Sequence, residues 1–206
     1  MRISPLCRGA GSAVLLATAL LLAGCGQAAS TDTDTAASGV TTSSAPVTTS
    51  AAPTTGQGDE PAPTGTAAAS GDPAGAEGLT VTSVRVGEHE EFQRVVFELA
   101  GTGTPGWLVE YVDAPSSQGS GAPVDVPGEA YLQVVLTGTS YPYETGAEEL
   151  GRGPVATGTG PVEGVVYDAT FEGQSVAWIG TTGQVPFQVS ALSDPSRLVV
   201  DVAKVP

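Results

Sequence analysis

Apolar and polar residues alternate along much of the second half of the chain. The alternating positions are Val95, Phe97 and Leu99; Trp107, Val109 and Tyr111; Leu132, Val134 and Leu136; and Leu198, Val200 and Val202. A period of two is typical of β-strands, and these segments are rich in Val and bounded by Gly or Pro. The pattern predicts strands over residues 79–86, 93–99, 107–113, 131–136, 162–171, 174–180, 185–192 and 197–202.

The connections between these segments have the composition of turns and loops. Residues 101–106 (Gly-Thr-Gly-Thr-Pro-Gly) predict a turn between two strands, and Thr181–Gln184 predict a hairpin turn. Residues 114–130 are rich in Gly, Pro and Ser and predict a long loop, whereas Gly146–Leu150 favour a single helical turn. Because no longer window has helical periodicity, the chain is expected to be all-β, a sandwich or a barrel.

The composition changes at Leu79. Residues 26–78 contain no aromatic residue, no Lys and no Arg, and they are rich in Ser, Thr, Pro, Ala and Gly. Such a segment cannot bury enough apolar surface to offset the entropy of ordering it, so a disordered linker is expected there. Residues 79–206 have the length of one ordinary domain.

The N-terminus has the layout of a secretory signal. Arg2 and Arg8 precede an apolar run over residues 13–22, which ends in Leu22-Ala23-Gly24-Cys25. This ending resembles a bacterial lipobox, which implies cleavage after residue 24 and a lipid on Cys25. Residues 25–78 are then a lipidated Cys and linker, and the lipid anchors the chain at the outer, extracytoplasmic face of the cell membrane. The alternatives are an uncleaved transmembrane helix, for which the run is short of the roughly 20 residues needed, and an ordinary signal with a chance Cys.

Charge and cysteine content exclude several classes of function. The formal net charge is −15, and it becomes −17 when the two Arg of residues 1–24 are removed. A chain this acidic is repelled by nucleic acid, so no nucleic-acid partner is expected. Cys7 lies in the predicted signal and Cys25 is the predicted anchor, so neither a disulfide nor a thiol nucleophile is left for the domain. No cofactor is predicted.

The sequence offers little that supports catalysis. His89 is the one His, and it lacks the partners that a metal site or a triad needs. A pair of carboxylates could serve glycoside hydrolysis if it lined a cleft at the required separation. The pairs considered are Glu110 with Asp113, Glu148 with Glu149, and Asp168 with Glu172. Acidic solubility explains these residues as well.

Aromatic side chains are the better candidates for binding. Trp107 and Tyr111 fall on the same side of one predicted strand, which is a sugar-stacking strip if that side is exposed and part of the core if it is not. Tyr141 and Tyr143 flank Pro142 in a loop-like stretch and are candidates for an exposed contact. The strands that begin near Arg94 and Arg197 predict structural ion pairs of these two cations with neighbouring carboxylates.

Four segments carry a family resemblance. Gln93–Leu99 (Gln-Arg-Val-Val-Phe-Glu-Leu) and Asp194–Val202 resemble the opening and closing strands of the AMIN domain, and Pro105–Val112 and Phe171–Ser175 are similar to the AMIN-like domain of bacterial lipoproteins. The resemblance covers residues 79–206 and implies a small β-sandwich. It also implies binding rather than catalysis, because AMIN domains are non-catalytic modules that localise amidases and secretion components, in part through peptidoglycan.

The sequence therefore leads to three hypotheses. The first is a lipid-anchored, non-catalytic module that binds peptidoglycan or another cell-wall glycan. The second is a protein-interaction module that docks on a membrane or secreted envelope protein. The third, and the least favoured, is a glycan-acting enzyme.

Overall fold

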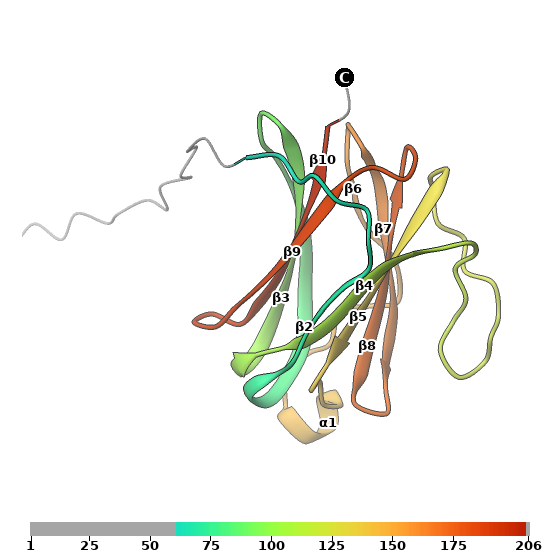
Figure 1. Ribbon diagram of the computed structural model, residues 1–206. Coiled ribbons are helices and arrows are strands. Elements are labelled where there is room, and N and C mark those ends of the chain that lie inside the picture. The colour runs from blue at the N-terminus through green and yellow to red at the C-terminus, as the bar shows by residue number, and fades with distance from the viewer. Residues whose placement is uncertain (1–60, 205–206) are drawn as a thin grey trace, which may run out of the picture. The chain divides into compact units, whose positions relative to one another are not determined.

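The computed structural model describes residues 61–204, which form two antiparallel β-sheets packed face to face (Figure 1). One sheet has six strands in the order β1 (Ala69–Gly71), β4 (Gly106–Val112), β5 (Ala130–Thr137), β8 (Gln174–Thr181), β7 (Val162–Phe171) and β6 (Gly153–Thr157). The other has four, in the order β2 (Ala74–Glu88), β3 (Phe92–Thr104), β10 (Arg197–Ala203) and β9 (Phe187–Leu192). A short helix, α1 (Pro142–Thr145), follows β5. The predicted all-β sandwich is confirmed.

The core lies between the two sheets. It is made by the inward positions that the alternation marks, among them Val95 and Phe97 of β3, Leu132 of β5 and Leu198 of β10, all fully buried. Burial of one such Val, Leu or Phe side chain contributes about 1.5–3 kcal/mol relative to exposure. The β3–β10 ladder places Leu198 opposite Phe97, so these two strands form the centre of the smaller sheet.

The predicted turn over residues 101–106 is shorter than expected and the predicted hairpin turn at 181–184 is wrong, and both connections cross from one sheet to the other. β3 continues through residues 101–104, and only Pro105 separates it from β4 in the opposite sheet. Likewise, β8 and β9 are not a hairpin, since residues 182–186 carry the chain between the sheets. Gly- and Pro-rich segments mark a change of chain direction, whereas packing determines which sheet the next strand joins.

The predicted helical turn and the predicted end of the linker are also displaced. The helix is Pro142–Thr145, and Gly146 ends it in the left-handed conformation with φ 72°, so residues 146–150 are not helical. Strand β1 and the first residues of β2 lie inside the segment expected to be disordered up to residue 78. β1 pairs with β4, where Gly71 lies opposite Trp107, so the ordered chain begins before Leu79.

The N-terminal predictions concern residues outside those described. The signal over 1–24, the lipid on Cys25 and the linker as far as residue 60 all lie there. Between residues 61 and 204, no helix is long and apolar enough to cross a bilayer.

Candidate functional site

A long loop, residues 113–129, lies over the outer face of the six-stranded sheet; we call it the covering loop. Beneath it is a second apolar cluster, with Val126 from the loop and Val166, Val176 and Trp178 from β7 and β8. Gly180 of β8 allows the close approach, because a Cβ there would lie 1.7 Å from the carbonyl oxygen of Pro127. The predicted loop over residues 114–130 is confirmed, and it is anchored on the sheet.

A pocket of about 380 Å³ lies at one edge of the covering loop; we call it the Arg152 pocket. Its lining comes from the covering loop, from the start of β6 and from β7. The lining residues are Ser117, Ser120, Ala122, Pro123, Val124, Arg152, Gly153, Val166, Tyr167 and Asp168. Arg152 and Asp168 are the two charged residues among them, one exposed and the other buried.

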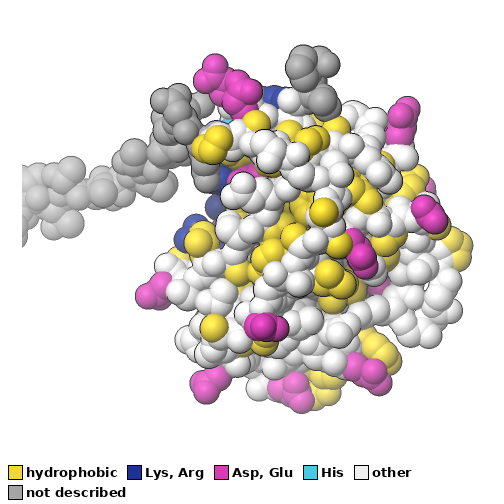
Figure 2. Space-filling view, in the orientation of Figure 1, with side chains coloured by type: hydrophobic (Ala, Val, Ile, Leu, Met, Phe, Trp, Pro, Cys, Tyr) yellow, Lys and Arg dark blue, Asp and Glu magenta, His cyan; other side chains and the backbone are white. Residues whose placement is uncertain are grey.

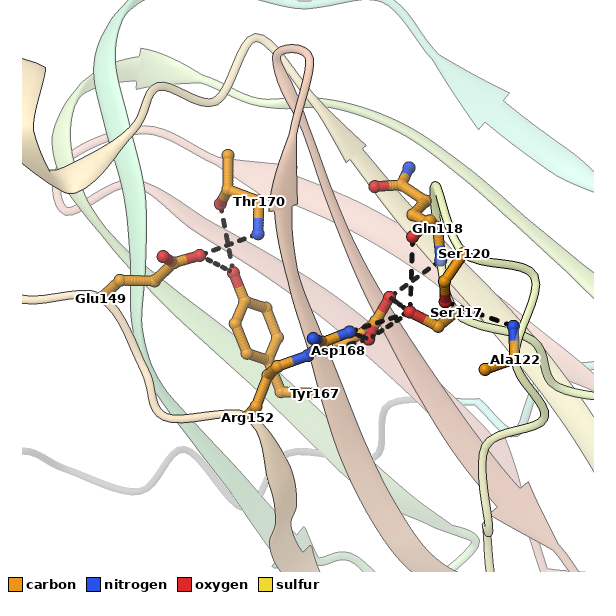
Figure 3. A network of polar contacts seen from close by, with 9 residues as sticks. All are labelled: Ser117, Gln118, Ser120, Ala122, Glu149, Arg152, Tyr167, Asp168 and Thr170. Atoms are coloured by element: carbon orange, nitrogen blue, oxygen red, sulfur yellow. Dashed lines mark hydrogen bonds and ion pairs between the residues drawn. The ribbon is translucent and has the colours of Figure 1, made fainter.

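Asp168 is the centre of a polar network that ties the covering loop to β7 (Figure 3). Its carboxylate accepts hydrogen bonds from Ser117 Oγ at 3.1 Å, from the backbone N–H of Gln118 at 3.0 Å and from Arg152 Nε at 3.1 Å. Arg152 Nη2 also contacts Asp168 and donates to Ser117 Oγ at 2.8 Å. The Asp168 side chain is 4% exposed and that of Arg152 is 61% exposed, so the pair is a dipole with its positive end outward.

A second network holds the strand beside the pocket. Glu149 accepts a hydrogen bond from the Tyr167 hydroxyl at 2.7 Å and another from the backbone N–H of Thr170 at 2.9 Å (Figure 3). Burial raises the pKa of Tyr167 far above its ordinary value, and the phenol therefore stays neutral and donates to Glu149. This network fixes the chain that leads into β6 against β7.

Tyr141 and Tyr143 form a stacked pair at α1, which we call the tyrosine pair. Their ring centroids are 5.2 Å apart and the rings are inclined by 12°. Tyr141 is held in place because its hydroxyl accepts a hydrogen bond from the backbone N–H of Glu172 at 3.0 Å, in the turn between β7 and β8. Tyr143 is 79% exposed, so the pair presents an aromatic face to solvent.

The turn between β7 and β8 connects the tyrosine pair to the covering loop. Phe171, 43% exposed, lies against the loop, since a Cβ on Gly119 would be 3.8 Å from its ring. Gln118 Nε2 donates to Gln174 Oε1 at 3.2 Å across the same turn. Figure 1 shows α1 and the β7–β8 turn at the same end of the sandwich. Exposed aromatic rings and the Arg152 pocket therefore flank one turn.

Trp107 and Tyr111 are half-buried and pack against the main core. The Tyr111 ring contacts Phe187 edge-on, and its hydroxyl donates to the Val185 carbonyl at 2.9 Å and accepts from the Val185 N–H at 3.0 Å. β1 covers Trp107, because a Cβ on Gly71 would lie 2.6 Å from the indole nitrogen. Of the two interpretations, the structure favours the core for these rings.

The two cations expected to form structural ion pairs, Arg94 and Arg197, have different kinds of partner. Arg94 makes a bidentate ion pair with Asp201 of the neighbouring strand, at 2.7 and 2.8 Å, and its guanidinium lies 5.2 Å from the Phe92 ring centre. Arg197 lies opposite Glu98 in the β3–β10 ladder, where its positive charge helps to lower the pKa of Glu98, but its Nε donates to the Pro195 carbonyl at 3.3 Å.

The remaining candidates for chemistry are scattered. His89 stacks on Phe92 at 4.5 Å in the turn between β2 and β3. In the pair Asp168–Glu172, Asp168 is enclosed by donors and Glu172 is exposed in a turn; of the pair Glu148–Glu149, only Glu149 joins the Tyr167 network. Glu110 is half-buried on β4 and Asp113 is exposed just after it. Among residues 61–204, no group of three or more His, Asp or Glu side chains could hold a metal ion.

Sequence reasoning missed Arg152 and Ser117. Neither lies in a recognisable motif, and they are 35 positions apart. The one usable signal was the scarcity of cations: a Lys or Arg in so acidic a chain needs a specific partner, and Arg152 precedes β6, a strand that the periodicity did not reveal.

Comparison with known protein families matches residues 79–204 to the AMIN-like domain. Neither the curated proteins nor the solved structures contain a match.

Proposed function

The chain belongs to the AMIN-like domain family, and on that premise we propose that it is a non-catalytic module that binds peptidoglycan or another cell-wall glycan. We further propose that a lipid on Cys25 holds it at the outer face of the cell membrane. The family match favours an extracytoplasmic place in the cell envelope. The lipobox-like Leu22-Ala23-Gly24-Cys25 supports the anchor, and residues 26–60 have the composition of a tether.

The observation that carries the proposal is the exposed tyrosine pair. An aromatic residue that remains 79% exposed, as Tyr143 does, on a domain with a well-filled core is the feature expected of a contact surface. Stacking on Tyr141 holds Tyr143 in one orientation, which lowers the entropy lost when a sugar ring packs against it. The Phe171 ring and the Arg152 pocket, beside the same turn, extend this surface.

Glu98 and Glu88 do not have the raised pKa that a general acid needs. Hydrogen bonds from Ser83 and Arg85 instead lower the pKa of Glu98. At Glu88, burial alone would raise the pKa, but hydrogen bonds from Gln93, Lys204 and Thr159 outweigh it and the net pKa is lowered. Asp168, the most buried carboxylate near the pocket, is used to anchor the covering loop.

Co-sedimentation of the intact chain with purified sacculi tests the proposal. We expect the wild type to sediment at low and moderate salt, and Tyr143→Ala to sediment less. Leu192→Ala is the matched control, because Leu192 is also an exposed apolar side chain, 41% exposed, but lies on β9. A wild-type chain that stays in the supernatant at both salt concentrations refutes the proposal.

Crosslinking in cells distinguishes the protein-interaction hypothesis. A wall-binding module should give adducts that disappear when the wall is digested. A single protein adduct that survives digestion would instead identify an envelope protein as the partner.

A further inference from the structure

The guanidinium of Arg152 is fixed from one side. Its Nε and Nη2 groups are directed to Asp168 and Ser117, whereas Nη1 makes no hydrogen bond to any residue of 61–204. Asp168 holds this orientation from a buried position on β7, and Ser117 holds it from the covering loop. Nη1 is therefore the part of this fixed guanidinium that is left to donate to a ligand at the pocket.

The charge arrangement favours an acceptor with negative charge. Acidic side chains are spread over the visible surface (Figure 2), so an anion meets general repulsion from this domain. At the Arg152 pocket the negative partner is buried and the positive one is exposed. Asp168 is compensated by Ser117, Gln118 and Arg152, so an approaching carboxylate would meet the positive end first.

Beside Arg152 the pocket offers small apolar side chains as well as the hydroxyls of Ser117 and Ser120. Ala122, Pro123 and Val124 of the covering loop and Val166 of β7 line it beside Arg152. Its volume, about 380 Å³, is near the lower end of the roughly 300–1,000 Å³ of small-molecule sites. The one aromatic residue in the lining, Tyr167, is buried, so the pocket has no exposed ring on which a sugar could stack.

We propose that the Arg152 pocket binds the free carboxylate of a short peptide that ends in a small apolar residue such as alanine. Arg152 donates to the carboxylate, and the terminal side chain packs against Val124 and Val166. This inference deepens the proposed function and rests on it for the source of the ligand, because a peptide branch of the wall would then enter the pocket while a sugar packs on the tyrosine pair.

Titration of the ¹⁵N-labelled intact chain with two matched small molecules tests the pocket directly. N-acetyl-alanyl-alanine carries the carboxylate, and its C-terminal amide has the same shape without the charge. We expect the first to shift the Arg152 Nε–Hε resonance saturably and to bind about tenfold or more tightly than the amide, as a charge-assisted hydrogen bond implies. Equal shifts with both molecules, equal shifts at Arg85, or a preference for galacturonate over the peptide would overturn the inference.

Variants separate the guanidinium from its charge. Arg152→Gln should lower affinity for the peptide about tenfold or more. Arg152→Lys should lose most of the same affinity, because an ammonium cannot be held by Asp168 and Ser117 through some donors while a further donor in the same rigid plane faces the ligand. Arg85→Gln is the control, because Arg85 is an exposed cation with a carboxylate partner outside the pocket. Amide spectra report folding, and Arg152→Lys keeps the test valid if Arg152→Gln disturbs the covering loop. Unchanged affinity in a folded Arg152→Lys or Arg152→Gln variant contradicts the assignment.

Co-sedimentation with sacculi separates this inference from the proposed function. If the wild type and Arg152→Gln sediment equally and the peptide does not bind, the subsite is wrong and wall binding stands. If the peptide binds at Arg152 but the wild type does not sediment, the subsite stands for a peptide from another source and wall binding is wrong.

Discussion

The Arg94–Asp201 ion pair should stabilise the sandwich far more than the Arg85–Glu98 pair of the same sheet. Both join an Arg and a carboxylate on adjacent strands. Arg94 and Asp201 are bonded twice, at 2.7 and 2.8 Å, with side chains 24% and 8% exposed. Arg85 and Glu98 are joined at 3.1 Å, with side chains 55% and 44% exposed. Burial is therefore the variable that differs most between them.

The magnitudes follow from that difference. Removing one partner of a buried pair costs about 3–5 kcal/mol, because the other charge is left without compensation, whereas an exposed pair contributes about 0.2–1 kcal/mol. Arg94 keeps some contact with water, so we expect a coupling energy of about 2–3 kcal/mol between Arg94 and Asp201. For Arg85 and Glu98 we expect less than about 1 kcal/mol.

Two double-mutant cycles measure these energies. Each uses the two single Ala variants and the double variant of the intact chain, unfolded in urea and followed by Trp fluorescence. The cycle cancels what Arg94 gains separately from the Phe92 ring, 5.2 Å away. A coupling energy for Arg94–Asp201 no larger than that for Arg85–Glu98 would refute the reasoning from burial.

Three further predictions concern the covering loop, the Tyr167 network and acid stability. Gly180→Ala should lower the free energy of unfolding by about 1–3 kcal/mol, since its Cβ would overlap the Pro127 carbonyl, while Gly183→Ala, which faces open space, should have little effect in the same urea titration. Tyr167→Phe should cost about 1–3 kcal/mol by removing the donor to Glu149, and an unchanged midpoint would contradict that role. Because its pKa is lowered in the folded state, ionised Glu98 stabilises the fold at pH values above the ordinary Glu pKa of 4.5, and this stabilisation is lost as the pH falls through the folded-state pKa. Ser83→Ala should make the loss of stability in acid smaller, and an NMR titration should show a higher pKa for Glu98 in this variant.

Strand positions were predictable where each strand has one face in the core. The periodicity placed β7 at residues 162–171, as observed, and β5, β8 and β10 to within about one or two residues, the usual uncertainty of an element's end. β1 gave no such signal, because Ala69–Gly71 has no large apolar residue. It is ordered by antiparallel pairing with residues 107–109 of β4. β6 was hidden by a register irregularity between Pro154 and Ala156, which breaks the alternation.

The candidate site was only partly predictable. The exposure of Tyr143 was predictable, because aromatic residues around a Pro outside a strand are typical of an exposed contact, whereas Trp107 and Tyr111 pack against the core. The Asp168–Arg152–Ser117 network depends on how the covering loop folds back on β7. That contact joins residues about 16 to 51 positions apart, and local pattern carries no information about it.

Hydrogen exchange of the intact chain, with and without soluble wall fragments that carry their peptide branches, tests the central claim most directly. We predict slower exchange on binding in three segments: residues 117–122 of the covering loop, residues 141–145 at the tyrosine pair, and residues 171–174 in the turn between β7 and β8. Protection confined to the opposite end of the sandwich, at residues 88–91, 158–161 and 182–184, would contradict the account, as would an unchanged exchange pattern at saturating concentrations of the fragments.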